Sequence, residues 1–171
     1  MTKKQTDFVK RYLTENHRIA QPIQRHQVTR VLFYGCGDRD YVPSVIEYLT
    51  PLFPYGVDLE FVPGGPRRTY REIMDPEKIE ISVAELAFYI QHHGVTGLIL
   101  AAHKRCGRYN HSRRNEQRRL TPDQLDERAK KHILVLKKAL VHRLPDSVTV
   151  FPIFIDVVTK GGKEYAEFVP L

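Results

Sequence analysis

Residues 97–107 read Gly97-Leu98-Ile99-Leu100-Ala101-Ala102-His103-Lys104-Arg105-Cys106-Gly107. The segment opens with an uninterrupted apolar run, which is typical of a strand buried on both faces of a parallel sheet. A histidine and a cysteine then follow in the spacing His-x-x-Cys. We therefore expect a buried strand that is followed by two side chains able to bind a metal.

A second segment has the same form. Val31, Leu32 and Phe33 make a short apolar run, and Tyr34-Gly35-Cys36-Gly37-Asp38-Arg39-Asp40 follows it. In an open parallel sheet the carboxyl ends of the strands lie at one edge, and sites are built there, where the strand order reverses. Cys36 is thus expected beside His103 and Cys106. Asp38 is close enough in sequence to bind the same metal or to accept a hydrogen bond from its water.

Thiolate and imidazole are ligands that zinc favours, and a catalytic zinc ion takes three protein ligands and leaves a fourth position open. Cys36, His103 and Cys106 supply that number, so the pattern predicts a zinc site. The alternative is that the two cysteines of the chain are only small buried hydrophobic residues. A disulfide between them is less favoured, because a chain of this size can bury a core without one and because reduced thiols bind metal.

The chain has 171 residues, of which 42% are hydrophobic, and a formal net charge of +7. Length and composition predict one globular domain over residues 1–171 with a sizeable core. No apolar run reaches the roughly 18 residues that span a membrane, and the polar start lacks the apolar core of a secretion signal. We therefore expect a cytoplasmic protein without membrane contact. The positive charge permits anionic partners but does not decide the function.

Strand and helix patterns alternate along the chain, which implies parallel strands joined by right-handed helical crossovers. The expected fold is α/β, with a mainly parallel four-stranded sheet flanked by helices and a short antiparallel C-terminal strand. Strands are expected at residues 31–34, 57–62, 97–102 and 148–158, the last one interrupted near Pro152, and then at 165–169 after a turn at Gly161 and Gly162. Helices are expected from Pro43 to Leu49, from a capping box at Ser82 and Glu85 to Gly94, and from a capping box at Thr121 and Gln124 to a point before Pro145.

Two segments leave alternatives open. Residues 2–16 place apolar side chains at helical spacing (Phe8, Val9, Tyr12 and Leu13), so a leading amphipathic helix is expected, packed on its own domain or on a second subunit. Residues 108–119 form a basic run with one tyrosine, which either binds nucleic acid or steers a small anion toward the adjacent site. We favour the anion for residues 108–119 and do not expect nucleic acid as a partner.

Three segments together resemble the β-class carbonic anhydrases: Cys36-Gly37-Asp38, Pro63-Gly64-Gly65 and His103-Lys104-Arg105-Cys106-Gly107. Each closes an expected strand in the order found in that family, and the similarity runs from about Gln27 to the final hairpin. The resemblance implies zinc held by Cys36, His103 and Cys106. It also implies that Asp38 either orients the nucleophile at the zinc or, in a closed resting form, binds zinc itself.

Further expectations follow from the same resemblance. Gln27 stands nine residues before Cys36, as does a substrate-contacting glutamine in many family members. Gly64 and Gly65 either form only a turn or let the backbone approach the substrate closely. The family's habit of exchanging leading helices implies a homodimer or larger assembly, with residues 1–26 packed on the partner subunit.

One position departs from the family pattern. Family members carry an arginine two residues after the aspartate, but that position is Asp40 here, and the arginine stands one residue earlier at Arg39. A carboxylate beside a thiolate-rich zinc needs a cationic neighbour to stay ionised. Three possibilities follow: Arg39 still reaches Asp38, Arg67 or Arg68 takes its place, or the pair is lost.

The resemblance implies reversible hydration of carbon dioxide to bicarbonate by a zinc lyase, with Asp38 and Arg39 as catalytic residues. A second possibility is a zinc-stabilised protein without this activity that binds anions or nucleic acid. A third keeps the enzyme and changes its substrate to a related linear molecule such as carbon disulfide or carbonyl sulfide.

Overall fold

Five strands form one sheet with the spatial order β2-β1-β3-β4-β5 in the computed structural model, which describes residues 31–53, 57–67, 79–107, 109 and 120–171. The first four strands are parallel, and β5 pairs antiparallel with β4. In chain order the elements are β1 (Val31–Cys36), α2 (Val42–Leu49), β2 (Asp58–Val62), α4 (Ile79–His93), β3 (Gly97–His103), α6 (Pro122–Val141), β4 (Thr149–Lys160) and β5 (Lys163–Pro170). The predicted fold class is confirmed.

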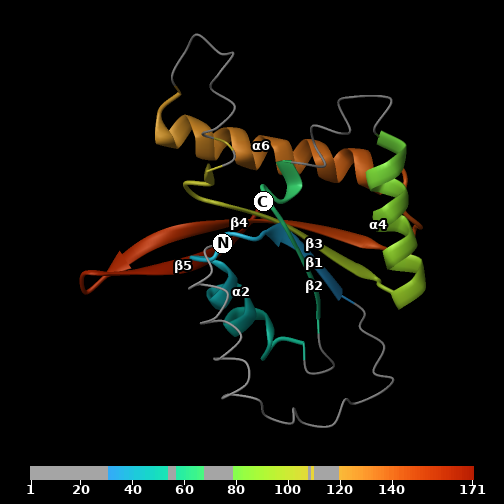
Figure 1. Cartoon of the computed structure of the whole chain (residues 1–171), viewed down its shortest axis with the longest axis horizontal. Coiled ribbons are helices and arrows are strands. Elements are labelled where there is room, and N and C mark those ends of the chain that lie inside the picture. The colour runs from blue at the N-terminus through green and yellow to red at the C-terminus, as the bar shows by residue number, and fades with distance from the viewer. Residues whose placement is uncertain (1–30, 54–56, 68–78, 108, 110–119) are drawn as a thin grey trace, which may run out of the picture.

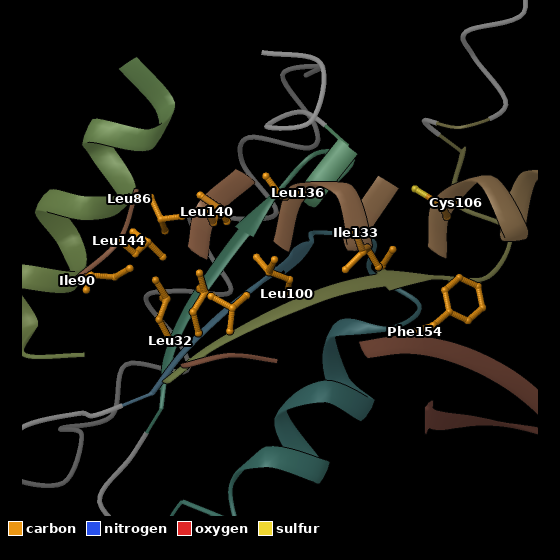
Figure 2. Close-up of a cluster of buried hydrophobic side chains, with 14 of the residues drawn as sticks. Leu32, Leu86, Ile90, Leu100, Cys106, Ile133, Leu136, Leu140, Leu144 and Phe154 are labelled. Carbon is orange, nitrogen blue, oxygen red and sulfur yellow. The ribbon is translucent and has the colours of Figure 1, made fainter. Parts of the chain in front are cut away.

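Helices lie on both faces of the sheet (Figure 1). α4 and α6 cover one face, and their buried side chains pack on β1, β3 and β4 in the cluster drawn in Figure 2. α2 covers part of the other face, where Val45 and Leu49 pack with residues of β1, β3 and β4. The layers are therefore helix, sheet and helix, as expected for parallel strands joined by helical crossovers.

β3 is the central strand, and all its residues are buried. Leu98 and Leu100 belong to the cluster under α4 and α6, whereas Ile99 and Ala101 belong to the cluster under α2. Successive side chains of a strand point to opposite faces. A continuous apolar run is therefore needed to fill both sides, which is why residues 97–102 carry no polar side chain.

α6 has the buried stripe expected from the sequence, formed by Leu125, Ala129, Ile133, Leu136 and Leu140. Its capping box is also confirmed, because the Thr121 side chain accepts from the Gln124 amide and the Gln124 side chain accepts from the Thr121 amide. The capping box thereby determines the residue at which this long helix begins.

Two expectations about element boundaries are corrected. β4 is not interrupted at Pro152 but runs through it from Thr149 to Lys160. The Pro152 carbonyl accepts the amide of Leu171, so the hydrogen that proline lacks would point toward the end of β5, and no bond to β3 is lost. Ser82 does not cap α4, because the helix has already begun at Ile79.

The two strands of the C-terminal hairpin meet at Gly161 and Gly162, which have φ values of 58° and 76°. Positive φ at both central residues defines the tight hairpin turn whose twist matches that of the strands, and glycine adopts it without strain. The expected turn is therefore in place, and the hairpin extends away from the rest of the sheet in Figure 1.

Some predictions fall outside the described residues: the N-terminal helix, Gln27, Arg68, and the basic run at 108–119 except Tyr109. Among the residues that the structure describes, no helix is both long enough and apolar enough to cross a lipid bilayer.

The core predicts a sharp difference between two neighbouring residues of α6. Ile133 is completely buried, whereas Leu134 is 40% exposed. Ile133→Ala should lower the free energy of unfolding by about 2–5 kcal/mol, because it removes buried methyl groups and leaves a cavity. Leu134→Ala should cost less than about 1 kcal/mol, since the side chain is already partly in water. Urea unfolding of both variants checks this, and similar losses would contradict the packing described here.

Candidate metal centre

The predicted metal ligands meet at the edge of the sheet where β1 and β3 end. Cys36 is the last residue of β1, His103 is the last residue of β3, and Cys106 lies in the loop after β3. One ligand atom from each of these residues lies within 4.8 Å of the others. The two sulfur atoms are 4.0 Å apart, and both cysteines are free thiols. The structure thus brings together three side chains that are far apart in the sequence.

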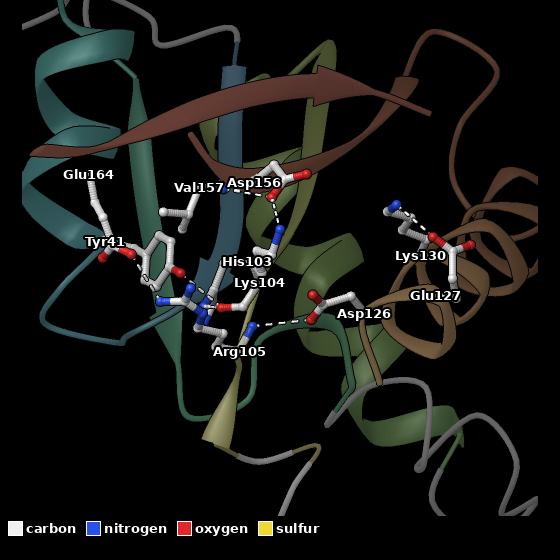
Figure 3. A network of polar contacts seen from close by, with 10 residues as sticks. All are labelled: Tyr41, His103, Lys104, Arg105, Asp126, Glu127, Lys130, Asp156, Val157 and Glu164. Carbon is white, nitrogen blue, oxygen red and sulfur yellow. Dashed lines mark hydrogen bonds and ion pairs between the residues drawn. The ribbon is translucent and has the colours of Figure 1, made fainter. Parts of the chain in front are cut away.

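The His103 ring is fixed in one orientation. Its Nδ1 lies 2.9 Å from the carbonyl oxygen of Lys104, which can only accept, so Nδ1 carries the proton and Nε2 keeps its lone pair. The Tyr41 hydroxyl donates to the same carbonyl at 2.8 Å, and the Tyr41 and His103 ring centres are 4.1 Å apart (Figure 3). Within the described chain, Nε2 is buried and has no hydrogen-bond partner. A buried ring nitrogen that keeps its lone pair, on a residue grouped with two thiols, is suited to bind a metal.

Electrostatics favour the thiolate form of Cys36. The pKa of the Cys36 thiol is lowered to about 4, chiefly by a hydrogen bond from Cys106 and also by His103 and the Gly64 amide, against the opposing effect of burial. For His103, burial lowers the pKa, but Cys36, the Lys104 carbonyl and Asp38 together outweigh burial, and the net pKa is raised. Thiolate is the form in which cysteine binds metals.

The turn after β2 supports Cys36 from the other side. The Gly64 amide donates to Cys36 Sγ at 3.3 Å. Gly65 has a φ of +49°, and a Cβ atom there would lie 2.7 Å from the Cys36 amide nitrogen. Both the backbone conformation and the close approach exclude other residues, so this turn holds the β1 end through backbone contacts alone.

Asp38 faces the same cluster. Its Oδ1 accepts the Asp40 backbone amide at 3.1 Å, and its Oδ2 lies 3.9 Å from His103 Nε2. The Asp40 backbone thus sets the direction of the Asp38 carboxylate toward the Cys36, His103 and Cys106 cluster.

The structure does not bring Arg39 to Asp38. The Arg39 side chain is 95% exposed and its Nε lies 3.6 Å from Asp40 Oδ1, because successive side chains diverge where the chain leaves β1. Arg67 is buried, with its guanidinium 5.0 Å from the centre of the Tyr109 ring. Among the described residues, the basic side chain within 4 Å of the Asp38 carboxylate is His103, whose Nε2 lies 3.9 Å from Oδ2. The expected pairing with Arg39 is therefore replaced by the backbone contact from Asp40.

The donor set fits a metal ion. Two thiols, one of them with a strongly lowered pKa, and an imidazole nitrogen without a partner in the described chain converge within 4.8 Å. Sulfur and imidazole donors suit zinc and other thiophilic transition metals. Cys36, His103 and Cys106 thus form a group able to hold a metal.

Sequence reasoning did not identify the residues that support the ligand loop, residues 103–106. Tyr41 and Asp126 bond to its backbone, and Lys104 forms an ion pair with Asp156 at 2.7 Å (Figure 3). The ion pair lowers the pKa of Asp156 and raises that of Lys104. The only signal in the sequence was the position of Asp126 in the α6 face that carries buried residues, where a carboxylate is out of place.

Neither the family models nor the curated proteins include a match to this sequence. Solved structures do match it. The β-carbonic anhydrase CafA of the fungus Aspergillus fumigatus has a TM-score of 0.55 at 15% identity, over 96% of this chain and 87% of that chain. The β-carbonic anhydrase isoform I of the protozoan Trichomonas vaginalis has a TM-score of 0.56 at 12% identity, over 100% of both chains.

A third match is one of two tetrameric β-carbonic anhydrases from the ascomycete Sordaria macrospora, with a TM-score of 0.52 and 14% identity over 98% of this chain and 95% of that chain. These similarities agree with the resemblance expected from the motifs. The chain has the fold of the β-carbonic anhydrases.

The lowered pKa predicts an unusual pH profile for Cys36 in the metal-free protein. An ordinary thiol has a pKa of about 8.5 and loses roughly tenfold in reactivity per pH unit below it. With a pKa of about 4, Cys36 should remain thiolate, so its alkylation by iodoacetamide should change little between pH 8 and pH 6. Peptide mapping by mass spectrometry follows Cys36 separately from Cys106.

Cys106→Ala provides the matched comparison, because the hydrogen bond from Cys106 is the largest cause of the lowered pKa. In that variant the pKa should rise and the rate at Cys36 should fall as the pH is lowered. A parent protein that shows this ordinary profile would contradict the arrangement of the two thiols.

Proposed function

We propose that this protein is a zinc lyase that catalyses the reversible hydration of carbon dioxide to bicarbonate. The observation that carries the proposal is the convergence of Cys36, His103 and Cys106 at the carboxyl ends of two parallel strands, in a β-carbonic anhydrase fold. Asp38 lies beside the three, with Oδ2 3.9 Å from His103 Nε2.

Each residue has a distinct role in the proposed site. Cys36, His103 and Cys106 would hold the zinc ion, and the Lys104 carbonyl, by accepting from Nδ1, leaves the His103 Nε2 lone pair available as a ligand. When bound, zinc supplies a Lewis acid at which water ionises with a pKa of roughly 7 instead of 15.7. Asp38 Oδ2 would accept a hydrogen bond from a donor beside the three ligands, while the Asp40 amide donates to Oδ1. Gly64 and Gly65 present backbone rather than side chains to the substrate, and Gln27 is proposed as a further substrate contact.

The role that the family gives to an arginine is filled here by a backbone amide. An amide hydrogen bond orients the Asp38 carboxylate as an arginine would, but it brings no full positive charge. Loss of the arginine favours the non-catalytic alternative, in which Asp38 is a further ligand of a structural zinc site. Activity measurements separate the two.

Zinc-loaded parent protein should accelerate carbon dioxide hydration in a stopped-flow assay, and metal-free protein should not. Asp38→Asn should lose about 10²-fold or more of this activity while keeping its zinc, because the amide cannot accept a proton. Asp40→Asn and Arg39→Ala should remain active, since Asp40 contributes only its backbone amide and the Arg39 side chain lies in solvent.

Metal analysis accompanies each assay. Cys106→Ser should lose zinc, because a hydroxyl is a much poorer zinc ligand than a thiolate. Parent protein that contains one zinc ion per chain but is inactive at every pH would support the non-catalytic alternative instead.

We also propose that the protein assembles into a homodimer or a larger homo-oligomer. One solved structure with this fold is described as tetrameric. At the amino ends of the parallel strands, opposite the edge with the candidate metal ligands, an apolar cavity of about 480 Å³ is lined by residues of α2, β1, β3 and β4 and by the carboxyl end of β5. Leu52 and Phe151 border it and are 54% and 50% exposed, so this face offers apolar area that a second copy would cover.

Light scattering at micromolar concentration should give at least twice the monomer mass. Phe151→Glu should lower that mass, because it places a charge on the proposed interface. Phe88→Glu is the matched control, since Phe88 is 68% exposed on α4, away from the cavity. A monomeric parent, or equal effects of the two variants, would contradict the proposed interface.

A further inference from the structure

Arg105 lies between two of the proposed ligands and has an unusual backbone. Its φ of 59° makes it the one non-glycine residue with positive φ in the described part of the chain. A long side chain is disfavoured in this left-handed conformation, because its Cβ crowds the backbone carbonyl. Such a residue persists only where its surroundings hold it in place.

The turn at Arg105 determines where Cys106 lies. The chain leaves β3 at His103 and turns sharply, so that Cys106 returns toward the cluster and its sulfur lies 4.0 Å from that of Cys36. If residue 105 relaxed to an ordinary negative φ, the direction of the chain at Cys106 would change and the two sulfurs would separate. The left-handed conformation is therefore part of the site's geometry.

Asp126 is the buried group that holds this turn. Its Oδ1 accepts the Arg105 amide at 3.1 Å, and the residue is only 8% exposed (Figure 3). It lies in α6 between the buried residues Leu125 and Ala129, so its position is fixed by the core. Burial raises the Asp126 pKa, and the Arg105 amide opposes this effect. Burying a carboxylate is unfavourable without hydrogen bonds, so this contact offsets a real cost.

The other contacts of Arg105 are weaker candidates. Its guanidinium lies 3.2 Å from Glu164, with both side chains about 60% exposed (61% and 59%), and exposed ion pairs contribute little. The ion pair between Lys104 and Asp156 connects the residue before Arg105 to β4, but it does not involve the Arg105 backbone. The contact to the amide of the strained residue itself comes from Asp126.

We propose that Asp126 is a positioning residue of the metal centre, which by accepting the Arg105 amide keeps that residue left-handed and so brings Cys106 to Cys36 and His103. The role depends on the proposed function only in that a metal is bound, and not on whether carbon dioxide is the substrate. Asp126 acts through the backbone of the loop, without touching metal or substrate.

Zinc affinity, measured by competition with a chromophoric chelator, tests the proposal. Asp126→Leu should weaken it by about 10- to 100-fold, as is typical when support of a ligand is lost. Asp126→Asn keeps an oxygen at Oδ1 and should retain affinity close to that of the parent. Asp123→Leu, on the exposed first turn of α6, is the control and should have no effect.

Arg105→Gly gives the decisive background, because glycine adopts positive φ without strain. In the Arg105→Gly protein, adding Asp126→Leu should reduce zinc affinity much less than it does in the parent. If Asp126→Leu only damaged the fold in general, the loss of zinc affinity would be the same in the two backgrounds. Glu164→Gln controls for the ion pair that Arg105→Gly also removes. The charge-transfer absorption of the cobalt-substituted proteins reports separately on thiolate coordination.

A metal-free measurement keeps the test independent of zinc and of activity. Phenylarsine oxide must bridge two thiols, so its capture by Cys36 and Cys106 reports their separation. Asp126→Leu should slow capture, and Arg105→Gly should restore it. Unchanged affinity and capture in Asp126→Leu, or equal losses in both backgrounds, would overturn the proposal. A parent that binds zinc without hydrating carbon dioxide would contradict the proposed function alone.

Discussion

The register of three parallel strands is the constraint on which the candidate metal centre depends. β1 pairs with β3 so that Tyr34 lies opposite Leu100, and with β2 so that Cys36 lies opposite Val62. Cys36, His103 and the Gly64 amide therefore reach the same edge together. A shift by one residue would turn every side chain of a strand to the other face. The packing of β3 between two hydrophobic clusters prevents such a shift, so the same apolar run builds the core and places the ligands.

Much of this could be predicted from local patterns. Continuous apolar runs predicted the parallel strands, and the alternation of strands and helices predicted the crossovers, because both depend on periodicity within a short segment. Cys36, His103 and Cys106 stood out since each follows such a run. Asp126 and Tyr41 could not be assigned, because they reach the loop from a distant helix and from the start of α2, and no spacing in the sequence signals that approach. Arg39 was assigned by proximity in sequence, yet its side chain points into solvent while the Asp40 backbone reaches Asp38. Pro152 suggested a break in β4, because the sequence does not show that the side of the strand where proline lacks a hydrogen faces the end of β5 rather than β3.

Backbone groups form many of the hydrogen bonds around the candidate site. The Lys104 carbonyl accepts both the Tyr41 hydroxyl and His103 Nδ1, the Gly64 amide donates to Cys36, and the Asp40 amide donates to Asp38. Contacts of this kind survive substitution of the side chain that carries them. A sequence can therefore diverge at positions 40 and 104 and still keep the geometry, which is consistent with a shared fold at identities as low as 12%.

The position of each strand in the sheet has a kinetic consequence. β3 is central and fully buried, whereas β2 is an edge strand of partly exposed residues. Edges open locally at a lower free energy than centres do. Transient fraying of β2 would withdraw the Gly64 amide from Cys36 and leave His103 and Cys106 in place on the core. Exchange of a metal ion bound at such a centre would then begin from the Cys36 side, and its rate would follow local opening of the sheet edge rather than global unfolding.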